Sequence, residues 1–143
     1  MLHLSADLLE EIGRRCLVAY PDECCGILLG KIAADAATVE HALPAPNIAD
    51  APARPTRYTI DPAAILQADR FARAHSLEII GFYHSHPDHP ARPSSTDAAL
   101  GWEVYTYLIV SVSSTAVLES RAWRFTPGET PREEAITIID HVT

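Results

Sequence analysis

The chain has 143 residues, of which 48% are hydrophobic and 21% are charged, as expected for one soluble globular domain spanning residues 1–143. Its formal net charge of −8 argues against a broad nucleic-acid-binding surface, which needs clustered positive charge. No apolar run approaches the ~20 residues of a membrane helix, and the N-terminus shows no secretion signal. The sequence therefore predicts neither nucleic-acid nor membrane partners.

The first half of the chain predicts one helix and three short strands. Ser5 is a suitable N-cap for a helix over residues 5–20, which Pro21 ends. Strands are predicted at residues 24–31, 37–47 and 56–60, with a proline-rich loop at 47–56.

The cysteines give no disulfide framework, because Cys16, Cys24 and Cys25 are odd in number and two are adjacent. A reduced, cytoplasmic setting is predicted instead. No Cys-x-x-Cys pair is present, which argues against a thiolate zinc site. Burial at the start of a strand accounts for Cys24 and Cys25 better than a redox or ligand role.

The second half predicts a central strand between two helices. Asp61 and Pro62 mark the start of a helix that continues to residue 75. Residues 77–86 are almost continuously apolar, which is typical of a strand covered on both faces. A helix is predicted over 94–105, an antiparallel hairpin over 106–113 and 116–125, and a last segment over 133–142 whose β-branched residues favour a strand over a short helix. This order predicts an α/β sheet layered with helices.

The end of the central strand carries a candidate metal site. His84 and His86 are two residues apart, so a strand would direct both imidazoles to one face. Asp97 follows after a loop stiffened by three prolines, in the expected first turn of the next helix. Two histidines and one carboxylate are a catalytic type of zinc set that leaves a fourth position for water.

His84-x-His86, Ser94 and Asp97, in this order and spacing, resemble the JAMM motif of the MPN+ metalloprotease family, and Glu23 provides the upstream glutamate of that motif. The resemblance covers most of the chain. It implies a cytidine-deaminase-like fold with a mixed β-sheet layered with helices. It also implies hydrolysis of isopeptide or peptide bonds that follow the C-termini of ubiquitin-like proteins.

The same resemblance implies a role for each motif residue. His84, His86 and Asp97 would hold one zinc ion per chain. Glu23 would take a proton from the zinc-bound water and pass it to the leaving amine. The Ser94 hydroxyl would donate a hydrogen bond to the oxyanion of the intermediate.

The length of the chain bears on the substrate. The chain has no room for the insertions with which ubiquitin-chain-cutting members grip ubiquitin, so it looks more like the short prokaryotic JAB-type members. This likeness implies a ubiquitin-like or sulfur-carrier protein that ends in Gly-Gly as the partner. The carrier, the residue or peptide released and the oligomeric state are left open; exposed sheet edges could pair two chains as a homodimer.

Several alternatives stand beside this hypothesis. The chain could be a non-catalytic MPN-type scaffold or a RadC-like protein; a deaminase would need a Pro-Cys-x-x-Cys element, which is missing. Ser94 and Asp97 also match a helix capping box, and Glu23 could be a solvated turn residue. Asp88 and His89 are interpreted as loop surface, with a role as groups behind the metal ligands or as spare ligands as the alternative, and Arg92 as loop surface or as a contact for a substrate carboxylate or backbone. Structural roles are predicted for Trp102, Tyr105, Tyr107, His3, His41, His75 and His141.

Overall fold

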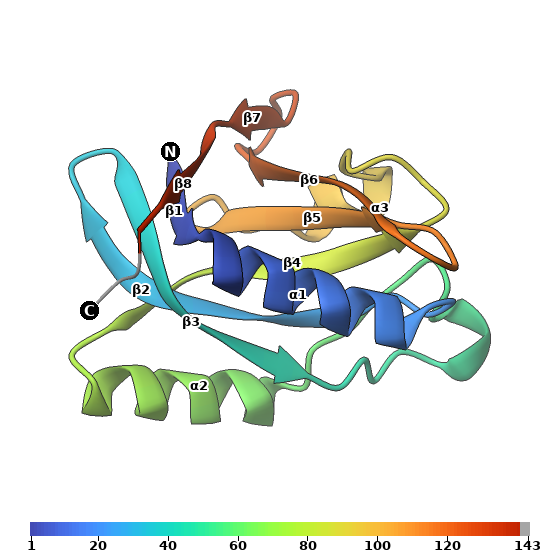
Figure 1. Ribbon diagram of the computed structural model, residues 1–143, viewed down its shortest axis with the longest axis horizontal. Coiled ribbons are helices and arrows are strands. Elements are labelled where there is room, and N and C mark those ends of the chain that lie inside the picture. The colour runs from blue at the N-terminus through green and yellow to red at the C-terminus, as the bar shows by residue number, and fades with distance from the viewer. Residues whose placement is uncertain (141–143) are drawn as a thin grey trace.

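The computed structural model describes residues 1–140, and its centre is an eight-stranded sheet in the order β7-β6-β5-β4-β2-β3-β1-β8 (Figure 1). The pairs β1–β3, β1–β8 and β4–β5 are parallel and the others antiparallel. The predicted α/β class with a mixed sheet is therefore confirmed. The strands are β1 (Leu2–Ser5), β2 (Cys25–Ala33), β3 (Ala36–Ala45), β4 (Glu78–Pro87), β5 (Thr106–Val112), β6 (Val117–Arg124), β7 (Arg132–Glu134) and β8 (Ile136–Ile139).

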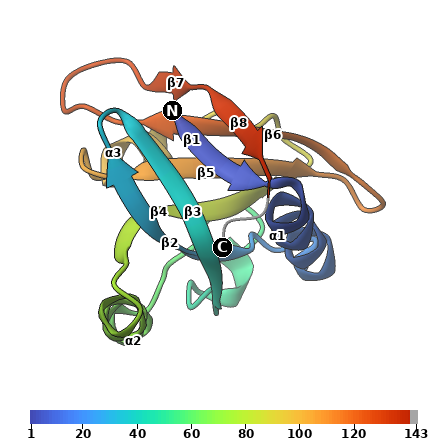
Figure 2. The ribbon, with the colours of Figure 1, turned by 60° about the vertical axis from the view of Figure 1, so that its left-hand side comes forward.

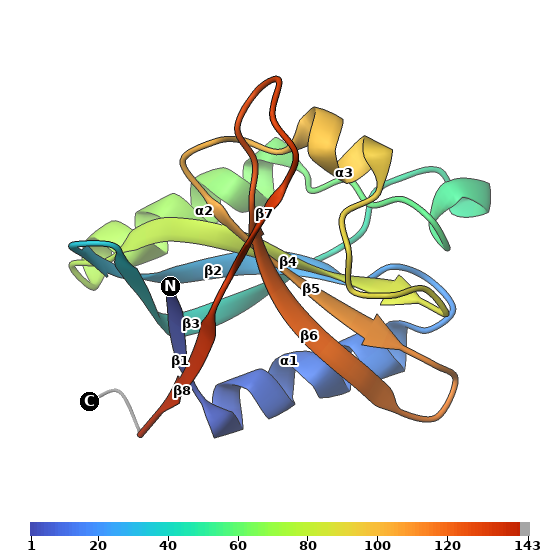
Figure 3. The same ribbon diagram turned by 90° about the horizontal axis from the view of Figure 1, so that it is seen from above.

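Helices cover both faces of the sheet. They are α1 (Ala6–Ala19), α2 (Pro62–Ala74) and α3 (Ser95–Leu100), with a short 3-10 helix at Ala51–Ala53. In Figures 2 and 3, α1 lies on one side of the sheet and α2 on the other. One apolar core lies under α1 and includes Leu28 and Tyr83; the second lies under α2 and includes Ile27 and Phe82. Consecutive residues of β2 and β4 thus serve opposite cores, as the pleat requires.

The predicted helix starts and the central strand are confirmed. The Ser5 hydroxyl accepts from the Leu8 amide, and the Asp61 carboxylate accepts from the Ala63 amide, so both helices begin with a side-chain cap. Strand β4 lies between β5 and β2, and it is buried from Ile80 to Pro87. None of the described helices is both long and apolar enough to cross a lipid bilayer.

In the first half of the chain one strand goes unpredicted and one predicted strand is absent. The strand β1 was not predicted, because four residues are too few to show a period; it forms by parallel pairing with β3 and β8. The strand predicted at 56–60 is absent, apart from one isolated bridge between Asn47 and Ile60. The Asn47 side chain instead bonds to the carbonyl of Arg57 and the amide of Thr59, which satisfies backbone groups that a strand would pair.

The helix predicted over 94–105 ends at Leu100. Gly101 takes an extended conformation, and a Cβ placed on it would lie 2.0 Å from the Phe125 ring. The next residue, Trp102, donates its amide to the Tyr107 hydroxyl at 2.8 Å. Packing against β5 and the segment after β6 therefore turns the chain away from the helix axis.

The last predicted strand is confirmed as extended chain but is divided in two. Strand β7 pairs with β6 at one end of the sheet, whereas β8 pairs with β1 at the other end. Only Ala135 separates them, and its carbonyl accepts from the Leu2 amide at 2.9 Å. The chain thus runs directly between the two ends of the sheet, which curves so that they meet (Figure 2). Residues 141 and 142 of the predicted strand lie outside the described part.

Gly81 permits the close approach of β4 and β5. A Cβ on this residue would lie 2.1 Å from the Thr106 carbonyl oxygen, a backbone atom. We expect Gly81→Ala to lower the free energy of unfolding by about 1–3 kcal/mol, the usual cost of overpacking, as measured by urea denaturation. The control is Gly13→Ala in α1, whose added methyl meets only the Val117 side chain, at 3.1 Å. An unchanged Gly81→Ala midpoint would contradict this account.

Candidate metal centre

The candidate centre lies where β4 ends. The side chains of Phe82, His84 and His86 alternate onto the α2 face of the sheet, and both histidines are buried, at 0% and 6% exposure. The loop after β4, the connection before β2 and part of the loop after β3 meet at this end of the sheet (Figure 3). Residues far apart in the sequence are thereby brought around the two imidazoles.

Asp97 completes a group of three ligand atoms. The Nε2 atoms of His84 and His86 are 3.2 Å apart, and they lie 3.3 Å and 2.9 Å from Oδ2 of Asp97. A tetrahedral zinc site with bonds of about 2.0–2.1 Å spaces its ligand atoms by about 3.3 Å. The separations within this triad fit such an ion. Among residues 1–140, His84, His86 and Asp97 are the His, Cys, Asp or Glu side chains that lie close enough together to hold a metal.

The orientation of His86 also suits a cation. Its Nδ1 lies 2.9 Å from the Pro90 carbonyl oxygen, which can only accept, so Nδ1 donates to that carbonyl and Nε2, on the side of Asp97, is left to bind a metal. Burial lowers the pKa of His86, but the hydrogen bond between Nε2 and Asp97 raises it overall, so a proton on Nε2 occupies the place that a metal ion would take. A carbonyl that orients a histidine in this way is common behind metal ligands.

His84 is held by stacking. Its ring lies 4.4 Å from the Tyr58 ring, centre to centre, with 24° between the planes. Burial lowers the pKa of His84, which favours the neutral imidazole that binds metals. Tyr58 was not among the residues predicted for the site, because it lies in an irregular loop and no motif marks it.

Ser94 and Asp97 form the capping box and also face the metal site. The Ser94 hydroxyl accepts from the Asp97 amide at 3.0 Å, and Oδ2 of Asp97 accepts from the Ser94 amide at 2.9 Å. The same Oδ2 approaches both histidines. Burial would raise the pKa of Asp97, but the hydrogen bonds from His84 and His86 hold it well below its usual value. The two interpretations of this motif are therefore compatible.

Glu23 is buried beside the triad and is not a solvated turn residue. It is 6% exposed, and its Oε1 has no hydrogen-bond partner. Burial raises the pKa of Glu23 to about 8. Its amide donates to the Arg54 carbonyl and its carbonyl accepts from the Asn47 side chain, so the loop after β3 fixes its backbone.

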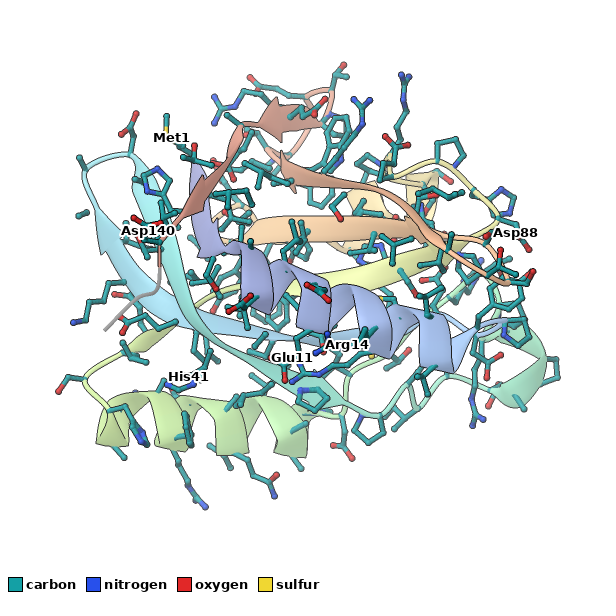
Figure 4. The ribbon with its side chains drawn as sticks, in the orientation of Figure 1. Met1, Glu11, Arg14, His41, Asp88 and Asp140 are labelled. Atoms are coloured by element: carbon teal, nitrogen blue, oxygen red, sulfur yellow. The ribbon has the colours of Figure 1, made fainter. Side chains whose placement is uncertain are left out.

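A cavity of about 350 Å³ lies beside Glu23, His86 and Ser94. It is lined by Glu23, Thr56, His86, His89, Pro90, Arg92 and Ser94. The loop that forms one wall is anchored at its tip, where the Tyr20 hydroxyl donates to Asp88 (Figure 4). His89 and Arg92 therefore line the candidate site, whereas Asp88 serves the loop.

A second, mainly apolar cavity of about 330 Å³ lies on the other side of Asp97. Tyr58, Trp102 and Tyr107 contribute to its lining. Tyr107 packs in the core as predicted, but Trp102 is 60% exposed and is not a core residue. The sequence could not show this, because the exposure follows from the early end of α3.

None of the cysteines and no other described histidine belongs to the triad. All three cysteines are free, and Cys25 is buried at the start of β2 as predicted, whereas Cys24 is partly exposed. His41 lies over α2, away from the loop that carries Asp88 (Figure 4), and its ring meets Phe71 edge-on at 5.3 Å. His141 lies outside the described residues.

The arrangement matches a known family. The family described as prokaryotic homologs of the JAB domain matches residues 5–126. The chain belongs to this family. The match spans α1 through β6 and so includes Glu23, both histidines, Ser94 and Asp97.

Three relatives are similar in sequence to this JAB-family chain. A desampylase of Haloferax volcanii is 38% identical over 64% of this chain and 63% of its own length. A probable TtuB-protein conjugate cleaving protease of Thermus thermophilus is 35% identical over 68% and 61%. A CysO-cysteine peptidase of Mycobacterium tuberculosis is 30% identical over 98% and 92%. The alignments thus span less than two thirds of the first two relatives.

Solved structures share the fold. A protein of Desulfitobacterium hafniense, solved in solution, matches with a TM-score of 0.86 and 29% identity over 98% of this chain and 94% of its own. A JAB1/MPN domain protein of Archaeoglobus fulgidus matches with a TM-score of 0.58 and 20% identity over 96% and 99%. The JAB/MPN fold therefore extends through nearly the whole described chain.

Proposed function

We propose that this chain is a single-domain zinc hydrolase that cleaves an amide bond at the C-terminal Gly-Gly tail of a ubiquitin-like or sulfur-carrier protein. The observation that carries the proposal is the triad of ligand atoms together with Glu23, which lines the same cavity as the triad member His86. Relatives named as a desampylase, a TtuB-conjugate protease and a CysO-cysteine peptidase support this substrate class.

We assign the three ligand positions to His84, His86 and Asp97. Zinc bound at such a site polarises a carbonyl and lowers the pKa of a bound water to about 7. Two imidazoles and one carboxylate are a ligand set found at catalytic zinc sites, whereas calcium and magnesium are bound by oxygen ligands.

Glu23 is the proton carrier in this proposal. Its Oε1 has no partner in the protein, and its raised pKa suits a group that accepts and returns a proton near neutral pH. It would accept a proton from the attacking water and deliver it to the leaving nitrogen. Without that delivery an amide nitrogen is a poor leaving group.

Ser94 is the proposed donor to the substrate carbonyl oxygen. In the capping box its hydroxyl oxygen only accepts, from the Asp97 amide, so the hydroxyl hydrogen remains available. Because the cap fixes the Ser94 rotamer, the donor is oriented before the substrate arrives. This is the type of preorganised hydrogen bond that stabilises a developing oxyanion.

Metal content tests the proposal directly. Protein purified without added metal or chelator is expected to contain about one zinc per chain by plasma emission spectroscopy. A chelator should abolish cleavage of a Gly-Gly-ended carrier conjugate, and added zinc should restore it. Protein that lacks zinc and does not take it up would contradict the proposal and favour a non-catalytic interaction domain.

The three free thiols agree with a reducing, cytoplasmic location.

A further inference from the structure

The two histidines of the triad are oriented in different ways. The Nδ1 atom of His86 lies 2.9 Å from the Pro90 carbonyl oxygen, which is the usual kind of partner behind a metal-binding histidine. His84 is fully buried, yet its Nδ1 has no hydrogen-bond partner within residues 1–140. The torsion that turns an imidazole ring has only a broad, roughly two-fold preference. Something other than a hydrogen bond at Nδ1 must therefore fix the plane of the His84 ring.

The strands beside His84 offer its Nδ1 no acceptor. Its cross-strand neighbours are Cys25 on β2 and Ile109 on β5. Ile109 has no polar side-chain atom, and the Cys25 thiol donates to the Ala45 carbonyl at 3.4 Å. The sheet therefore buries the imidazole without setting the angle of its plane.

Tyr58 supplies the missing constraint. Its ring is stacked on the His84 imidazole, 4.4 Å away centre to centre, with 24° between the planes. In a close-packed interior the imidazole cannot turn out of this plane without pushing the tyrosine aside. In the stacked position, Nε2 of His84 lies 3.2 Å from Nε2 of His86 and 3.3 Å from Oδ2 of Asp97. The stack thus holds the ring with Nε2 at its place in the triad.

The backbone on both sides of Tyr58 is itself fixed. The Asn47 Nδ2 donates to the Arg57 carbonyl at 2.9 Å, and its Oδ1 accepts from the Thr59 amide at 3.1 Å. The same Nδ2 donates to the Glu23 carbonyl at 3.0 Å. Tyr58 therefore belongs to an anchored segment, as a residue that orients a metal ligand requires.

We propose that Tyr58 is a positioning residue for the metal centre, whose ring, in place of a hydrogen bond, holds the His84 imidazole with Nε2 directed at the metal. This inference rests on the function proposed above. Tyr58 contributes no ligand atom to the triad, so it acts on the metal only through His84. The planar ring carries this role and the hydroxyl does not. Phenylalanine should therefore replace the tyrosine, whereas a non-planar apolar side chain should not.

The test measures zinc affinity by competition with a chromogenic chelator, and the visible absorption of the cobalt(II)-substituted protein, which depends on ligand geometry. Tyr58→Phe keeps the ring, whereas Tyr58→Leu and Tyr58→Met replace it by apolar side chains without a plane. Methionine adapts to irregular gaps, so it provides a second variant if leucine prevents folding. Phe71→Leu is the matched control, because Phe71 is stacked on His75 at 4.2 Å and 23°, and His75 is outside the triad.

Tyr58→Phe is expected to show the zinc affinity and the cobalt spectrum of the wild type. Tyr58→Leu and Tyr58→Met should each lose about 10–100-fold in zinc affinity, the usual effect of a residue behind a metal ligand. Their cobalt spectra should also differ from that of the wild type. Phe71→Leu should retain both the affinity and the spectrum.

Four outcomes would overturn the inference. Wild-type zinc affinity in Tyr58→Leu and Tyr58→Met would remove the positioning role but leave the proposed hydrolase intact. A loss in Tyr58→Phe as large as that in Tyr58→Leu would assign the effect to the hydroxyl. An equal loss in Phe71→Leu would assign it to general packing of aromatic side chains. Wild-type protein that binds no zinc would contradict the proposed function, and the inference with it.

Discussion

Glu23→Gln is expected to bind zinc as the wild type does and to lose about 10²–10⁴-fold in the rate of cleavage, the usual contribution of a general acid–base group. Glutamine keeps the size and the oxygen of the side chain but cannot accept a proton. Glu23 is outside the triad of ligand atoms, so its substitution leaves the three metal contacts unchanged. The measurements are zinc per chain and single-turnover cleavage of a carrier conjugate.

Glu103→Gln is the matched control, because Glu103 is an exposed glutamate in the segment after α3. It should retain both zinc and full activity. If Glu23→Gln cleaves at the wild-type rate, the proton-transfer role is wrong. If it loses zinc, Glu23 contributes to the metal site rather than to the chemistry.

His86→Ala is expected to weaken zinc binding by at least about 100-fold, since even residues behind the ligands are worth 10–100-fold in affinity. The His86 Nε2 lies within 3.2 Å of both other ligand atoms, so its loss opens the centre of the triad. Affinity is measured by competition with a chromogenic chelator. His41→Ala, an exposed histidine over α2, should leave the affinity unchanged. Wild-type zinc content in His86→Ala would exclude this site.

Asp97→Asn provides a finer test of the same centre. An asparagine oxygen can still accept from the Ser94 amide, so the start of α3 should be kept, while the negative charge toward the metal is lost. Zinc affinity should fall, and hydrogen exchange of the α3 amides in the metal-free proteins should stay close to that of the wild type. Faster exchange across α3 would indicate that the substitution acts through the cap.

The sequence alone predicts the three metal ligands, because they lie within fourteen residues of one another. His84 and His86 share a face because a strand alternates, and the short proline loop returns Asp97 to the same point. Glu23 was different: its sixty-one-residue separation from His84 is bridged by the antiparallel pairing of β2 with β4. Only the family resemblance indicated that contact.

Other features depend on tertiary contacts that no local pattern encodes. Tyr58 reaches His84 because the Asn47 side chain replaces a strand ladder in its loop. The end of α3 is set by the fit of Gly101 against Phe125, which are distant in sequence. The β-branched residues of 133–142 correctly favour extended chain over the described part of this range, but composition cannot tell which neighbour each half of a strand will pair with.

The passage of residues 132–139 from β7 to β8 has a consequence for how the protein unfolds. In an open sheet the two outermost strands can fray independently, but here they are successive parts of one segment, and each has only three or four residues. Detaching one strand pulls on the other, so the two ends of the sheet are cooperatively linked. Such short terminal strands also offer little backbone for a second chain to extend. This arrangement makes edge-to-edge pairing a weak route to self-association.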